Sequence, residues 1–124
     1  MGFVYILEVC DPEGLSPDLP DHEAISEQRD RRLAKPSERL SMLLARIRQQ
    51  PLGVTVNVVA GPKHLDVVWG KDQPGSALGE GAWYAHWTLM LPMEDDVDAL
   101  QDAAESLTFW AEELGLRVFD VQRD

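Results

Sequence analysis

The clearest hydrophobic pattern in the chain lies near its end, between Val97 and Leu114. Apolar residues recur there in steps of three and four, which places them on one face of an α-helix. Acidic residues precede this stretch and suit the positive end of the helix dipole. Gly115 follows it, and glycine readily adopts the left-handed conformation that ends a helix. We therefore predict a helix of about twenty residues that stops at Gly115.

Shorter segments have the alternating or continuous apolar patterns of strands. Residues 3–10 form an opening strand of β-branched and aromatic residues, and residues 116–121 form a closing one. Segments 53–60, 64–70 and 82–92 predict three more strands. In the last of these, alternation places five apolar residues on one face: Trp83, Ala85, Trp87, Leu89 and Leu91.

Two further helices are predicted in the first half of the chain. Residues 22–34 have few apolar anchors, and Asp21 could cap this helix. Ser37 begins a better one, in which apolar residues again recur at helical spacing. Residues 11–23 and 70–81 are rich in glycine and proline, which predicts loops.

The order of these elements predicts a single domain over residues 1–124. A strand, a long helix and a closing strand form the crossover expected between parallel neighbours, and such crossovers are right-handed. We expect an α+β or α/β fold: a two-layer domain in which two or three helices pack on a mixed sheet of about five strands.

Charge narrows the range of partners. The 124 residues contain 11 bases and 22 acids, so the net charge is 11 − 22 = −11 and the pI is near 4.5. Such a surface repels nucleic acids and anionic membranes and attracts basic proteins. Residues 1–10 lack the basic start of a secretory signal, and no apolar run has the length of a membrane span. We expect a cytoplasmic protein.

Catalytic motifs are not recognisable in the sequence. His22, His64 and His86 are scattered without metal-ligand spacing, and Cys10 is the only cysteine. Cys10 ends a strand, where a buried thiol is expected. For His86 we expect a satisfied or solvent-facing side chain. We therefore predict a binding protein with no catalytic residues, no metal and no cofactor.

Acidic residues gather on the side of the last helix that faces away from its apolar stripe. Phe109 falls among them, a composition typical of a surface that meets a basic partner through an aromatic anchor. The loop 70–81 is a second contact candidate. The predicted partner-binding residues are Asp95, Asp98, Asp102, Phe109 and Glu113 on the helix and Lys71, Asp72 and Glu80 in the loop.

The end of the chain, "AEELGLRVFDVQ", resembles the ending of small bacterial immunity proteins, in which Gly-Leu, an apolar pair, aromatic-Asp and x-Gln follow a helix. The matching residues are Gly115, Leu116, Val118, Phe119, Asp120 and Gln122. The opening "GFVYILEV" and the segment "LMLP" at 89–92 are also similar. Val121 departs from the pattern, because the family often has proline there.

This resemblance implies a protein that binds one cognate toxin in a stoichiometric complex, as in the polymorphic toxin loci of type VI secretion and Rhs systems. The implied toxin would have a basic surface, since an acidic inhibitor associates quickly with such a surface. Two alternatives stay open. One is a small enzyme that reverses a toxin's modification, and the other is a regulatory or adaptor protein of a secretion locus.

Overall fold

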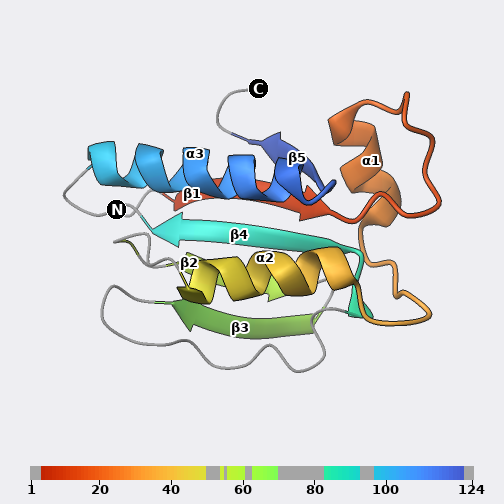
Figure 1. The fold of residues 1–124 in the computed structure, drawn as a ribbon, viewed down its shortest axis with the longest axis horizontal. Coiled ribbons are helices and arrows are strands. Elements are labelled where there is room, and N and C mark those ends of the chain that lie inside the picture. Colours follow the sequence, from red (N-terminus) through yellow and green to blue (C-terminus); the bar gives the residue numbers. More distant parts are fainter. Residues whose placement is uncertain are drawn as a thin grey trace.

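The computed structural model describes residues 4–49, 54, 56–60, 63–69, 83–92 and 97–121. In this part of the chain, five strands form one sheet and three helices pack against it (Figure 1), so the predicted α+β fold is confirmed. In chain order the elements are β1 (Val4–Cys10), α1 (Asp21–Gln28), α2 (Glu38–Gln49), β2 (Val56–Ala60), β3 (Lys63–Trp69), β4 (His86–Pro92), α3 (Val97–Glu113) and β5 (Arg117–Asp120).

The strand order in the sheet is β3-β2-β4-β1-β5, and every pair of neighbours among these strands is antiparallel. The sequence pattern predicts a mixed sheet, and this prediction is wrong because all the strand pairs of the described sheet are antiparallel. The crossover through α3 does join two strands that run in the same direction, β4 and β5. They are not neighbours, because β1 lies between them and pairs with both. Sequence periodicity identifies the crossover but gives no information about an intervening strand.

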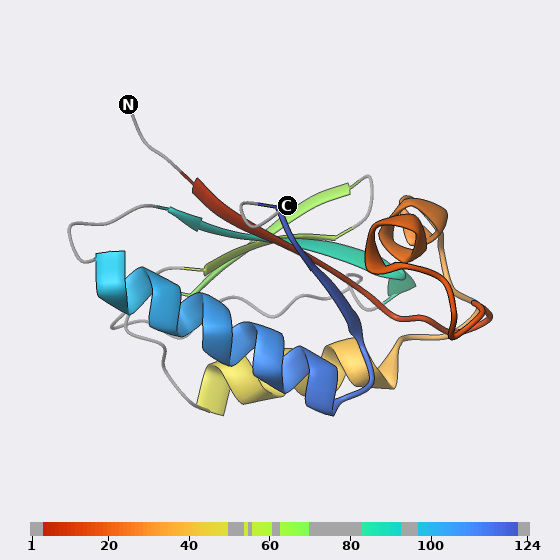
Figure 2. The same cartoon turned by 90° about the horizontal axis from the view of Figure 1, so that it is seen from above.

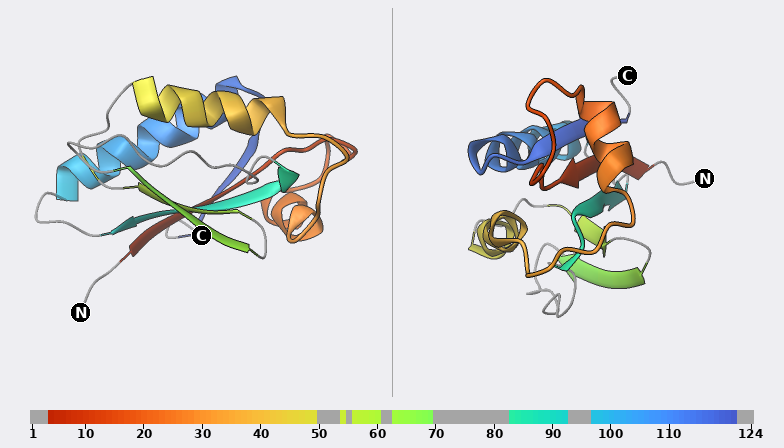
Figure 3. Two further views of the ribbon diagram at one scale, coloured as in Figure 1. Left: turned by 90° about the horizontal axis from the view of Figure 1, so that it is seen from below. Right: turned by 90° about the vertical axis from the view of Figure 1, so that its right-hand side faces the viewer.

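The helices divide unequally between the two faces of the sheet. α2 and α3 lie side by side on one face, and α1 lies on the other face at one end (Figures 2 and 3). Between the sheet and the helix pair is the main core, to which β4 contributes Trp87, Leu89 and Leu91, all fully buried. A smaller cluster beneath α1 contains Cys10, Ala24 and Ile25.

The end of α3 has the hydrogen bonds of a glycine-terminated helix. Gly115 has a φ of 82°, its N–H donates to the carbonyl of Glu112 at 3.0 Å, and the N–H of Leu116 donates to the carbonyl of Ala111 at 2.9 Å. This pair of bonds is the Schellman arrangement, which satisfies carbonyls that the helix leaves open. The predicted helix stop at Gly115 is confirmed.

The first helix is shorter than predicted. α1 ends at Gln28 rather than near residue 34, and Asp30 two residues later has a φ of 63°. Asp21 does not cap this helix; it is the first helical residue, and its carboxylate accepts a hydrogen bond from Arg117 at 2.6 Å. The apolar stripe of residues 22–34 is too sparse to carry the helix further, and the chain turns instead to pair residues 31–33 with residues 83–85.

That pairing also shortens the strand predicted over residues 82–92, since β4 begins only at His86. Ala85 donates its N–H to the carbonyl of Arg31, and Leu33 donates to the carbonyl of Trp83. Trp83 is only half-buried, whereas Trp87 has no exposed surface. The predicted strands 53–60 and 64–70 correspond to β2 and β3, and the loop 70–81 lies outside the described residues.

Truncation of a side chain should affect stability strongly on the buried side of α3 and only slightly on its exposed side. Leu107 is 1% exposed in the core, so Leu107→Ala should lower the free energy of unfolding by about 2–5 kcal/mol through cavity formation. Phe109 is 62% exposed, so Phe109→Ala should change stability by about 0.5 kcal/mol or less. Denaturant melts of both variants test this. An unfolded or strongly destabilised Phe109→Ala protein would mean that another layer covers this side of α3.

Candidate partner-binding surface

The outer face of α3, turned away from the sheet, is acidic around one aromatic side chain. Phe109 is the most exposed of the large hydrophobic side chains in the described part of the chain. The acidic residues of this face are all exposed: Asp98, Asp102, Glu105, Glu112 and Glu113. A phenylalanine on a solvated acidic helix is the kind of anchor that protein interfaces bury.

Among the described residues, Arg46 of α2 is the base that pairs with a carboxylate of this face. Glu113 lies 3.7 Å from Arg46 of α2, a pair with both side chains well exposed. For Asp98, Asp102 and Glu112, no ion pair is found within the described ranges. The outer face of α3 therefore keeps a local negative potential that attracts a basic surface.

A groove runs beside the outer face of α3, where the helix passes over β1 and β5. Its volume is about 230 Å³ and it opens to solvent. Its lining combines aromatic, aliphatic and acidic side chains: Tyr5, Ala104, Glu105, Thr108, Phe109, Glu112, Val118 and Asp120. Phe109 therefore belongs both to the outer face of α3 and to the groove.

Small side chains and one hydrogen bond form the base of this groove. Ala104 and Val118 come from α3 and β5 and leave space between the helix and the sheet edge. The Tyr5 hydroxyl donates to Asp120 Oδ2 at 2.5 Å, which fixes an aromatic ring and a carboxylate across the two neighbouring strands. Sequence patterns did not reveal this groove, because its residues come from three elements.

The predicted site residues fall into two sets. Asp98, Asp102, Phe109 and Glu113 all lie exposed on α3, and Glu113 is turned toward α2 by its pairing with Arg46. The remaining predictions, Asp95, Lys71, Asp72 and Glu80, lie outside the described residues.

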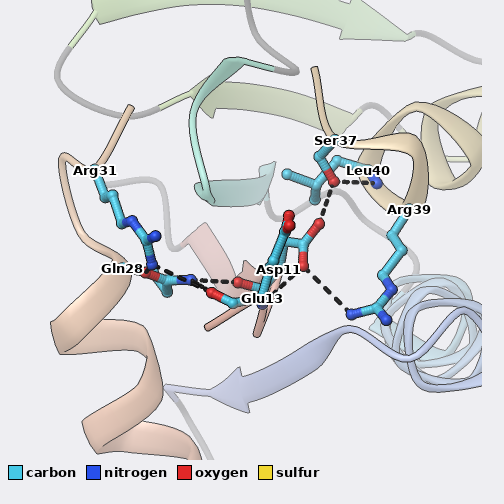
Figure 4. Close-up of polar contacts among 7 residues, drawn as sticks. All are labelled: Asp11, Glu13, Gln28, Arg31, Ser37, Arg39 and Leu40. Carbon is cyan, nitrogen blue, oxygen red and sulfur yellow. Dashed lines mark hydrogen bonds and ion pairs between the residues drawn. The ribbon is translucent and has the colours of Figure 1, made fainter. Parts of the chain in front are cut away.

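The most extensive polar network of the described chain surrounds Asp11, which is 4% exposed (Figure 4). Its Oδ2 accepts from the Ser37 hydroxyl at 2.6 Å, and its Oδ1 accepts from the Glu13 N–H at 3.0 Å and from Arg39 at 3.3 Å. The Ser37 oxygen also accepts from the N–H of Leu40 at 3.1 Å. This last bond is the predicted cap of α2 and is confirmed.

A second half of the network reaches α1. Gln28 is fully buried, and its amide donates to the carbonyl of Asp11 at 2.6 Å and to that of Glu13 at 3.3 Å. Arg31 then donates to Gln28 Oε1 at 2.9 Å. Both oxygens of the Asp11 carboxylate already accept bonds, and no histidine is among the described residues that line the adjacent 270 Å³ cavity. Asp11 and Ser37 therefore join the end of β1 to the start of α2.

His86 is buried, which corrects the expectation of a satisfied or solvent-facing side chain. It is 5% exposed, and its Nε2 lies 3.3 Å from Glu8 Oε1 without the geometry of a hydrogen bond. Arg29 reaches the same Glu8 oxygen at 3.3 Å. Burial lowers the pKa of His86 from its usual 6.5, and the nearby negative charge of Glu8 opposes that effect. His86 therefore favours its neutral form.

Cys10 is the buried thiol that the sequence predicts, with no exposed surface. Burial raises the pKa of its thiol to about 12, so the reactive thiolate is not populated near neutral pH. The side chain of Cys10 therefore packs in the small core beneath α1.

Within the ranges that the structure describes, no group of three or more histidine, cysteine or acidic side chains could hold a metal ion. No helix there combines the length and apolar character needed to span a bilayer. Comparison of the chain with protein-family models, curated proteins and solved structures found no match.

Because Ser37 bonds both to Asp11 and to the first turn of α2, removal of its hydroxyl should lower the stability of the protein. Ser37→Ala removes the cap of α2 and leaves one oxygen of buried Asp11 without its donor, so we expect a loss of about 1–3 kcal/mol in unfolding free energy. Ser41→Ala, an exposed change in the same helix, is the control and should have an effect within about 0.5 kcal/mol. Equal unfolding free energies of the two variants, measured in denaturant melts, would contradict the bridging role of Ser37.

The lowered pKa of His86 predicts a loss of stability in mild acid. As pH falls through 6.5, His86 takes up a proton in the unfolded chain before it does so in the folded protein, so unfolding becomes more favourable. The free energy of unfolding should therefore decrease between pH 7.5 and pH 5.5. His86→Gln should make this decrease shallower. An unchanged pH slope in His86→Gln would contradict the argument.

Proposed function

We propose that the protein is a stoichiometric inhibitor of the immunity type, which neutralises a basic toxin by binding it through the outer face of α3. The observation that carries the proposal is the 62% exposure of Phe109 among acidic side chains. A solvated helix gains no stability from an aromatic residue at that position. A partner that covers the ring would gain binding free energy from it.

Charge supports a basic partner for this surface. The chain carries a net charge of −11, and six of its carboxylates, those of α3 and β5, lie exposed or half-buried on these two elements. Opposite charge accelerates the encounter of two proteins, and an anchored aromatic side chain slows their dissociation. A toxin inhibitor requires both properties, because it must capture its target before damage occurs.

The segments that resemble immunity proteins also lie together in the fold. β4, β1 and β5 are consecutive strands of the sheet, and α3 lies along β1 and β5 (Figure 1). Within these segments Gly115 ends α3, Leu116 is buried, and Asp120 accepts the Tyr5 hydroxyl. These residues have architectural roles, and they place the outer face of α3 at the surface.

Titration distinguishes inhibition from repair of toxin damage. The chain is co-produced with a toxin encoded beside its gene, and toxin activity is measured against the molar ratio of the two proteins. A stoichiometric inhibitor should protect only near a ratio of one to one. Full protection at a small fraction of that ratio would overturn the proposal in favour of an enzyme. Tight binding to a non-toxic neighbour would instead indicate an adaptor.

Phe109→Ala should weaken binding to the toxin by about ten- to a hundredfold, since burial of a phenylalanine side chain contributes about 1.5–3 kcal/mol. The dissociation constant is measured by calorimetry after a melt has shown that the variant is folded. Met42→Ala is the control, because Met42 is a large apolar side chain that is 57% exposed and belongs to α2 and not to α3. Equal affinities of Phe109→Ala and the unmodified protein would exclude Phe109 as the anchor.

A further inference from the structure

We propose that the segment between α1 and α2 is an acid-sensitive strap, which detaches from residues 83–85 when His86 takes up a proton. The strap consists of residues 29–36, and its middle pairs with residues 83–85, directly before His86 at the start of β4. Detachment is a local opening, in which the sheet and its main core stay folded. The inference concerns a conformational change and does not depend on the proposed function.

The residues that flank the strap are both bonded to Asp11 (Figure 4). Before the strap, the Gln28 amide donates to the carbonyl of Asp11 at 2.6 Å. After it, the Ser37 hydroxyl donates to Asp11 Oδ2 at 2.6 Å. All three of these residues are buried. The middle of the strap can therefore leave residues 83–85 while α1 and α2 keep their positions.

The middle of the strap is held to residues 83–85 by a small number of contacts. Leu33 donates its N–H to the carbonyl of Trp83 at 2.7 Å, and Ala85 donates to the carbonyl of Arg31 at 3.0 Å. The Arg32 guanidinium lies 5.4 Å from the centre of the Trp83 ring. Leu33 is the only buried residue of the strap, and it belongs to neither hydrophobic core cluster. Segments with so little buried apolar surface open at a lower free energy than core strands do.

His86 supplies the acid sensitivity, because its imidazole is buried beside the strap. The side chain is 5% exposed, and its Nε2 has no hydrogen-bond partner in the described structure. Nε2 lies 3.3 Å from Glu8 Oε1, and Arg29 of the strap donates to the same oxygen at 3.3 Å. A protonated imidazole in this position would carry a desolvated charge without a well-aligned acceptor, which costs free energy. Opening of the strap lets water solvate that charge.

The charged groups that act on the imidazole belong to β1 and to the strap. Burial, the largest effect, lowers the pKa of His86 from 6.5, and the positive charge of Arg29 lowers it as well. The negative charges of Glu8 and Asp30 oppose these effects without cancelling them. Cys10, the register partner of His86 on β1, stays protonated because burial raises the pKa of its thiol to about 12. β2, the strand on the other side of β4, contains no charged residue.

Proton binding therefore favours the open strap. In the open state water reaches the imidazole and its pKa returns to the usual 6.5, whereas in the closed state the pKa is lower. As the pH falls below 6.5, the open state binds the proton before the closed state does. The opening equilibrium then becomes more favourable, by at most about tenfold per pH unit for one proton.

Amide hydrogen exchange of the full chain, followed by NMR at pH 7.5 and pH 5.5, tests the opening. Each rate is compared with the intrinsic rate at the same pH to give a protection factor. Protection of the Leu33 and Ala85 amides should be at least about tenfold lower than that of the β4 amides, and it should fall about three- to tenfold between the two pH values. Urea at low concentration should lower the protection of β4 but not that of the strap, because a local opening exposes little surface. Equal protection and equal urea dependence of strap and β4 would overturn the proposal.

His86→Gln tests which group controls the opening, because glutamine is polar but does not titrate. In this variant the ratio of strap protection at pH 7.5 to that at pH 5.5 should fall to about one. Any loss of protection that the substitution causes at both pH values cancels in this ratio. Thr88→Val, at a half-buried position two residues further along β4, is the control and should keep the three- to tenfold ratio. The same ratio in His86→Gln as in the unmodified protein would refute the role of His86.

A titration of the His86 imidazole, followed by its ring resonances in NMR spectra, tests the direction of the coupling. The pKa of His86 in the folded protein should lie below 6.5. A pKa at or above 6.5 would overturn the proposal, because the closed structure would then accept the charged imidazole beside Glu8 and acid would hold the strap in place.

Discussion

The buried carboxylate of Asp11 is the constraint on which the arrangement of helices depends. A carboxylate with 4% exposure is stable only when its oxygens accept hydrogen bonds, and its donors come from the first turn of α2 and from the loop after β1. The main chain at the same residue accepts from Gln28 of α1. One residue directly after strand β1 therefore positions the end of α1 and the start of α2. If either helix shifted, a buried polar group would lose its partner.

The fixed position of α2 in turn orients α3. The two helices lie side by side on one face of the sheet, and Arg46 of α2 contacts α3 twice, over the Trp110 ring at 5.8 Å and beside Glu113 at 3.7 Å. Arg39 extends the Asp11 network to the turn at Gly115, where an added Cβ would lie 3.7 Å from its guanidinium carbon. Because the core stripe of α3 is directed at the sheet, over β1 and β5, Phe109 lies on the solvent side of the helix.

The features that the sequence predicted are those that a single segment determines. The stripe of α3, the stop at Gly115 and the cap at Ser37 depend on residues within about one helical turn of each other, so periodicity and capping rules suffice. The extent of α1 and the antiparallel sheet depend on distant partners. α1 ends where residues 31–33 pair with residues 83–85, and β4 and β5 are separated by the first strand of the chain.

The groove beside α3 also depends on residues that are distant in the sequence, so a sequence pattern does not predict it. On a helical wheel, Glu105, Thr108 and Glu112 are ordinary polar positions at the border of the outer face of α3, with nothing to mark them as a site. They line a groove only because β5 lies beside β1. This antiparallel pairing brings Tyr5 within hydrogen-bonding distance of Asp120, 115 residues away in the sequence. Val118 on the same strand then faces Ala104, and both side chains are small enough to leave a depression between helix and sheet. The carboxylates of the groove come from α3 and β5, its aromatic side chains come from α3 and β1, and the open space results from the packing of all three elements. A depression of this kind is a property of the fold, whereas the acidic character of the chain can be read from its composition.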